Sequence, residues 1–157
     1  WSNNISLDAK HDIKKISKIT TEFPPIIKRF SKKFITIYNQ ALTAEENELT
    51  EICRLGYRKA FEFLIKDYLI KKNEKEEHQT IKEMQLYPCI NKYVTNDEIK
   101  LLAHRILWLG NDHAHYVKRW KGKSLSDLKR LITLSLKWIV IHEELLKVMK
   151  DMPKGKK

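Results

Sequence analysis

Three polar side chains, those of His104, Asn111 and His115, recur within residues 99–116 at intervals of seven and four residues. On a helix, these intervals place all three along one stripe of the surface. An imidazole exchanges protons near neutral pH, and a carboxamide both donates and accepts hydrogen bonds. The stripe therefore predicts either a site for acid–base chemistry or a hydrogen-bonded network at an interface. Arg105 lies about 80–100° from the stripe, and its long side chain would bring a guanidinium group within reach of a phosphate.

The same segment is apolar on both sides of this stripe. Its opposite face carries three aliphatic side chains that are expected to enter a core: Leu102, Ile106 and Leu109. Leu107 and Trp108 flank the polar stripe itself. A helix of this kind is either central in a bundle or presents its second face to a partner. The pattern predicts a subunit interface that contains His104, Leu107 and Trp108.

A basic segment with one aromatic side chain, Trp120, follows the polar stripe. Its cations are Lys118, Arg119, Lys121 and Lys123. Residues 99–123 carry a net charge of +5 in a chain whose formal net charge is +11. Clustered positive charge is the electrostatic footprint of phosphate binding. We therefore expect the cations to contact the phosphates of a nucleic acid and Trp120 to stack on a base. The alternative is that a lysine-rich surface only keeps the protein in solution.

The residue pattern does not favour a metal or redox centre. On a helix, His113 and His115 point about 200° apart, so they could bind one ion only if the helix ended at Gly110. Cys53 and Cys89 belong to no Cys-x-x-Cys pair, which favours two reduced, buried thiols. We expect no metal and no other cofactor.

The elements that would position these side chains are helical. The 157 residues, 42% of them apolar, supply one core, and four Gly and four Pro are few for an all-β fold. Apolar residues recur every three or four positions, which predicts helices at about 32–47, 48–72, 86–94, 99–114 and 125–150. Residues 73–80 are expected to form an acidic connection or a short surface helix. The predicted fold class is an all-α bundle of four to six helices.

Polar residues mark the expected helix starts. Ser31, Thr95 and Ser124 are the predicted N-caps, and Glu98 and Asp127 complete capping boxes with the last two. The last helix should turn nine of its side chains inward: Leu128, Leu131, Ile132, Leu134, Ser135, Trp138, Ile139, Ile141 and His142.

The chain divides into three parts. Pro24-Pro25 separate an irregular N-terminal arm, residues 1–30, from a helical body at 31–150 and a basic tail at 151–157. The chain begins at Trp1 rather than Met, so we expect a piece of a longer protein with an upstream module. It shows no signal-peptide pattern and no apolar run long enough to span a membrane, which predicts a cytoplasmic protein without a membrane partner.

Two stretches, the second of them in two parts, resemble the domain-of-unknown-function 4145 family. They are YNQALTAEENELTEICRLGYRKAFEFLIKDYLI at residues 38–70, HRILWLGNDHAHY at 104–116 and DLKRLITLSLKWI at 127–139. That family resembles the HEPN group of helical bundles, many of which are dimeric, metal-independent RNases. The resemblance covers about residues 31–145. It implies a HEPN-like bundle, a homodimer whose motif helices meet at the dimer axis, a place in a bacterial defence or restriction-type protein, and a zinc ribbon upstream.

The HEPN nuclease motif pairs an Arg and a following polar residue with a His four to six positions after the Arg. By this resemblance Asn111 and His115 match the polar residue and the His, whereas Gly110 stands where the Arg belongs. Arg105 would have to replace the missing cation. The Arg58 and Glu62 side chains of the first stretch are expected to form an intrahelical ion pair. The sequence thus predicts a dimerisation and nucleic-acid- or nucleotide-binding module without robust catalysis. Two alternatives stay open: a metal-independent RNase that uses His115, and a protein-interaction scaffold with no nucleic-acid role.

Overall fold

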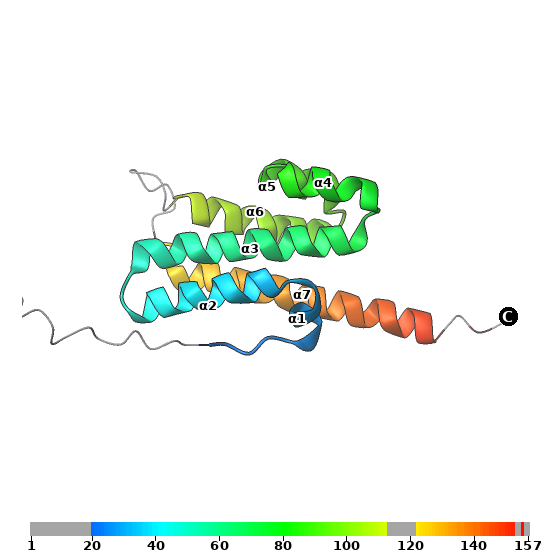
Figure 1. The fold of residues 1–157 in the computed structure, drawn as a ribbon, viewed down its shortest axis with the longest axis horizontal. Coiled ribbons are helices and arrows are strands. Elements are labelled where there is room, and N and C mark those ends of the chain that lie inside the picture. Colours follow the sequence, from blue (N-terminus) through cyan, green and yellow to red (C-terminus); the bar gives the residue numbers. More distant parts are fainter. Residues whose placement is uncertain (1–19, 113–121, 153–154, 156–157) are drawn as a thin grey trace, which may run out of the picture.

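The predicted all-α bundle is confirmed by the computed structural model, which describes residues 20–112, 122–152 and 155 (Figure 1). These residues form seven helices and no strand. In chain order they are α1 (Pro25–Phe30), α2 (Lys32–Glu46), α3 (Thr50–Lys72), α4 (Lys75–Glu83), α5 (Leu86–Tyr93), α6 (Asp97–Asp112) and α7 (Leu125–Asp151). The number exceeds the four to six expected because α1 and α4 are helices of six and nine residues. None of the described helices is both long enough and apolar enough to cross a bilayer.

The boundary predicted at residue 31 is wrong, because the core includes residues that precede it. Pro25 opens α1 rather than ending a helix, since proline is tolerated in the first helical turn. Ile27 is completely buried, and the Phe23 ring packs edge-on against Phe34, with centroids 5.0 Å apart. The folded body therefore begins no later than Phe23.

Ser31 joins two helices instead of capping one. It stands at the N-cap position of α2, but its side chain makes no capping hydrogen bond there. Its hydroxyl donates to Asp67 Oδ2 at 2.6 Å, and Ser31 itself is completely buried. Burial raises the pKa of Asp67 above its usual value, and the bond from Ser31 partly offsets this effect. The capping prediction failed because the acceptor lies in α3, 36 residues away.

The two longest N-terminal helices, α2 and α3, run side by side in the bundle (Figure 1). The two helices approach closely at Gly56, where an added Cβ would lie 2.8 Å from Ala41 Cβ. A polar link joins this pair to α7: the buried Tyr57 donates its hydroxyl to Glu45 Oε2 at 2.5 Å. Lys129 Nζ donates to the same carboxylate oxygen at 2.8 Å. One carboxylate thus connects α2, α3 and α7.

Of the N-caps predicted for α6 and α7, the first is wrong by one residue and the second is confirmed. The cap of α6 is Asn96, whose Oδ1 accepts the backbone N–H of Ile99 at 3.1 Å, and not Thr95 as predicted. The shift by one residue follows from the helix beginning at Asp97. The capping box of α7 is confirmed: the Ser124 N–H donates to Asp127 Oδ2 at 2.8 Å.

The inward face of α7 agrees only in part with the prediction. Leu128, Ile132, Ser135 and Ile139 are buried as expected. Two of the predicted core residues are exposed instead, Leu134 by 40% and Ile141 by 57%. The apolar stripe of this helix is therefore wider than its core contact.

Both cysteines are free and buried. Burial raises the pKa of the Cys53 and Cys89 thiols, which keeps them protonated and unreactive at neutral pH. The described residues bring together no group of three His, Cys, Asp or Glu side chains that could hold a metal ion.

Candidate nucleic-acid interface

Three rings form an aromatic stack on the outer surface of α5 and α6. The Tyr87 and His104 rings have centroids 4.9 Å apart and planes inclined by 24°. His104 stacks in turn on Trp108, one helical turn further along α6, with centroids 6.0 Å apart and an inclination of 28°. Tyr87 is 50% exposed and Trp108 is 41% exposed. Exposed π-faces in series are the surfaces on which proteins stack unpaired bases.

His104, the middle ring of the aromatic stack, is held in its neutral form. Burial, and the nearby positive charge of Lys100, lower the pKa of His104 below its ordinary value of 6.5. Its Nε2 is buried and has no hydrogen-bond partner in the described part of the chain. A neutral imidazole suits a stacking role between Tyr87 and Trp108. The same environment makes His104 a poor proton donor at neutral pH.

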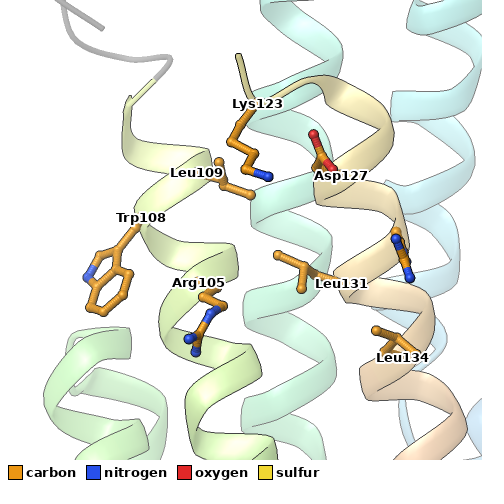
Figure 2. A pocket seen from close by; sticks show the side chains of 8 residues that line it. Arg105, Trp108, Leu109, Lys123, Asp127, Leu131 and Leu134 are labelled. Atoms are coloured by element: carbon orange, nitrogen blue, oxygen red, sulfur yellow. The ribbon is translucent and has the colours of Figure 1, made fainter. Parts of the chain in front are cut away.

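A cleft of about 290 Å³ opens between the end of α6 and the start of α7. Figure 2 shows Arg105, Trp108 and Leu109 projecting from α6, and Leu131 and Leu134 from α7 on the other side. The aliphatic side chains form an apolar floor, and Trp108 belongs to both the cleft and the aromatic stack. The two features therefore form one continuous surface across α6.

The α6–α7 cleft is positively charged. Arg105, Lys123 and Arg130 line it, against a single carboxylate from Asp127. The Ser124 N–H that Asp127 accepts holds the pKa of this carboxyl below its usual value, and the charges of Lys123 and Arg130 act in the same direction. Asp127 is thus engaged at the start of α7, and the cleft keeps an excess of two positive charges.

The predicted site residues separate into distinct positions. Arg105 and Lys123 line the α6–α7 cleft, and His104 and Trp108 lie at the surface in the aromatic stack. The prediction that Leu107 lies at a subunit interface is wrong: it is 2% exposed and belongs to the chain's own core. Its direction differs from that of Trp108 by one residue step of about 100°, enough to turn it inward.

Five predicted residues lie outside the part of the chain that the structure describes. They are His115, Lys118, Arg119, Trp120 and Lys121. Their predicted roles in catalysis, phosphate contact and base stacking stay predictions.

Asn111 is paired with an arginine that the spacing argument did not assign to it. Arg58 on α3 donates from Nε to Asn111 Oδ1 at 2.7 Å, and its Nη1 lies 3.9 Å from Glu62 Oε2, the predicted intrahelical pair. Gly110 makes room for this contact, because a Cβ there would lie within 2.9 Å of three carbons of the Arg58 side chain. Arg105 does not replace the missing motif arginine beside Asn111; it lines the cleft, and its Nη1 donates to the Leu101 carbonyl at 3.1 Å.

Sequence reasoning missed Tyr87, Arg130 and Arg58 as members of these sites. Tyr87 and Arg58 reach α6 from other helices, so no local spacing connects them to it. The sequence gives a weak indication for Arg130. It follows the capping box of α7 and lies on the face of the helix opposite Leu128 and Ile132, which predicts an outward-facing cation near the start of α7. Only the packing of α7 against α6 brings it opposite Arg105.

No protein-family model, curated protein or solved structure matches this chain. The resemblance to the domain-of-unknown-function 4145 family therefore stays a prediction from the motifs in residues 38–70, 104–116 and 127–139. The geometry that bears on function is that of the aromatic stack and the α6–α7 cleft.

Proposed function

We propose that this chain is a module that binds single-stranded nucleic acid, RNA above all, across α6. The observation that carries the proposal is a cleft with three cations that shares Trp108 with an exposed aromatic stack. Single-strand-binding proteins combine these same two features, a positive groove for the backbone and aromatic faces for the bases. The sequence resemblance supports a place in a bacterial defence or restriction-type protein and a homodimer.

The α6–α7 cleft and the aromatic stack would bind different parts of the nucleic acid, the backbone and the bases. Arg105, Lys123 and Arg130 would neutralise phosphates in the cleft, and the guanidinium groups offer forked donors to phosphate oxygens. Trp108 and Tyr87 would take unpaired bases on their exposed faces. Stacking tolerates every base, so we expect affinity for single strands with little preference for sequence.

We expect the affinity for a labelled single-stranded RNA to fall steeply with salt, and less steeply once the cleft loses its arginines. Each phosphate contact contributes about 0.7 to the slope of log affinity against log salt for single strands. Replacing both Arg105 and Arg130 with glutamine should therefore reduce that slope by about 1.4. Fluorescence anisotropy titrations at four or five salt concentrations measure it.

The control for that experiment removes the same charge elsewhere. Lys33 on α2 and Lys147 on α7 are exposed and lie outside the cleft, so their double replacement by glutamine should leave the slope nearly unchanged. An equal loss of slope in both double variants would mean that net charge, and not the cleft, attracts the RNA. Wild-type protein without salt-dependent affinity would favour the protein-interaction scaffold.

A second candidate function, a metal-independent RNase, is favoured by one specific contact. The bond from Arg58 to Asn111 brings a guanidinium group to the residue that matches the polar position of the HEPN motif. Arg58 would then stabilise the charge that develops on the scissile phosphate, the task of the arginine missing at Gly110. His115 is the predicted base that takes the proton of the attacking 2′-hydroxyl.

If the chain is a metal-independent RNase, metal-stripped protein should cleave labelled RNA at saturating RNA concentration. Removing the general base in His115→Ala should slow cleavage by about 100-fold or more. Arg58→Gln should slow it as well, whereas Arg105→Gln should not, since Arg105 faces the cleft. Unchanged cleavage in His115→Ala, or no cleavage by the wild type, would rule this function out.

A further inference from the structure

The last turns of α7 project beyond the other helices of the bundle (Figure 1). Six large apolar side chains on this part of the helix are between 41% and 74% exposed: Ile141, Leu145, Leu146, Val148, Met149 and Met152. Exposed large apolar side chains gathered on one part of a folded protein mark an interaction surface.

The rotation of α7 about its axis is fixed by contacts with α3. His142 Nδ1 lies 2.6 Å from the Tyr68 hydroxyl, and Glu143 forms ion pairs with Lys71 and Lys72, the latter at 2.6 Å. These contacts turn the face containing His142 and Glu143 towards the bundle. Ile141 and Leu145 are thereby directed to the opposite side.

The exposed face has the residue spacing of a coiled coil. Ile141, Leu145, Val148 and Met152 follow one another at intervals of four, three and four residues. The alternation extends back to Trp138, which packs against the bundle, and to Leu134, which lines the α6–α7 cleft. This alternation keeps one apolar seam facing a partner helix along a supercoil. We call Ile141, Leu145, Val148 and Met152 the α7 seam.

Charges beside the α7 seam indicate what covers it. One flank carries Lys137, Glu144 and Asp151 at intervals of seven residues. In an antiparallel pair of identical helices the same flanks meet. The Lys137 of each copy then faces an acidic residue of the other copy, which gives two such pairs in the dimer. In a parallel pair this flank would meet the one that carries Ser135, His142 and Met149, which has no carboxylate. Charges at these flanking positions set partner and orientation in coiled coils.

We infer that the α7 seam is a self-association surface, on which α7 of a second copy packs antiparallel. Because the seam projects from the bundle, antiparallel pairing places the two bundles at opposite ends of the paired helices. This interface differs from the one predicted at His104, Leu107 and Trp108, and it leaves the aromatic stack open. It does not depend on the proposed nucleic-acid function.

The test is the molar mass of the protein in solution, measured by sedimentation equilibrium over a range of concentrations. The wild type should approach twice the chain mass of 18.8 kDa. Replacing Leu145 and Val148 with serine should weaken association by at least about 100-fold, because each side chain is buried twice in the dimer. These residues are exposed in the single chain, so circular dichroism should show the variant folded at low concentration.

Two further variants separate this interface from other causes. Ile52 and Leu55 on α3 are comparably exposed, and replacing both with serine should leave the association constant unchanged. Lys137→Glu should weaken association, and adding Glu144→Lys and Asp151→Lys should restore it. A wild type that is monomeric at every concentration, or a Leu145→Ser/Val148→Ser protein that still dimerises, would overturn the inference. Charge variants without effect would overturn the antiparallel arrangement.

Discussion

Replacing Trp108 with alanine should weaken the binding of single-stranded RNA by about 5- to 150-fold, since stacking contributes about 1–3 kcal/mol per base. The side chain is 41% exposed and stacks on the neutral ring of His104, so it presents a face to solvent while its other contacts hold it in place. No charge is removed, so the salt dependence of the affinity should stay that of the wild type. This separates Trp108→Ala from the arginine variants of the cleft.

Two control variants accompany this prediction, a conservative substitution of Trp108 itself and a substitution on another helix. Trp108→Phe keeps an aromatic face and should recover most of the affinity. Leu55→Ala removes a comparably exposed apolar side chain on α3 and should have no effect. Anisotropy titrations at one salt concentration decide between the outcomes. Affinity unchanged in Trp108→Ala would exclude base stacking at the aromatic stack and would reduce the proposed surface to an electrostatic patch.

The sequence predicts the main helices because their apolar residues repeat over many turns. Helices α2, α3, α6 and α7 each have at least fifteen residues, so the period is sampled several times and chance matches are averaged out. A six-residue helix such as α1 offers fewer than two turns. The two prolines at its start, Pro24 and Pro25, are as compatible with the end of a preceding helix as with the beginning of a new one. The capping box at Ser124 was predictable because both partners are three residues apart.

Contacts between distant residues were beyond sequence reasoning. Arg58 and Asn111 are 53 residues apart, and nothing in the spacing of either helix connects them. The predicted pairing of Arg58 with Glu62 is confirmed, yet it describes only one side of that guanidinium group. Likewise, the pattern of α6 identified Arg105 and Trp108, but the residues opposite them depend on how α5 and α7 pack. His104, Arg105, Trp108 and Lys123 could therefore be foreseen, whereas Tyr87 and Arg130 could not.

Gly56 is a position where adding one methyl group should destabilise the fold. Alanine is favoured over glycine within a helix by about 1 kcal/mol. At Gly56, however, the new Cβ would lie 2.8 Å from Ala41 Cβ, which is fixed to the backbone of α2 and cannot rotate away. The helices must then separate, and overpacking of this kind costs about 1–3 kcal/mol. Once the gain of about 1 kcal/mol in helix propensity is subtracted, we expect Gly56→Ala to lower the free energy of unfolding by up to about 2 kcal/mol, measured by urea denaturation.

Moving the methyl group from one helix to the other tests the cause. Ala41→Gly alone should destabilise by about 1 kcal/mol through helix propensity. Combined with Gly56→Ala it restores a single Cβ at the contact, and the gain in propensity at residue 56 offsets the loss at residue 41. The double variant should therefore unfold close to the wild-type midpoint and show a large favourable coupling between the two sites. If the double variant were as unstable as the two single changes added together, the contact between Gly56 and Ala41 would not be what limits the approach of α2 and α3.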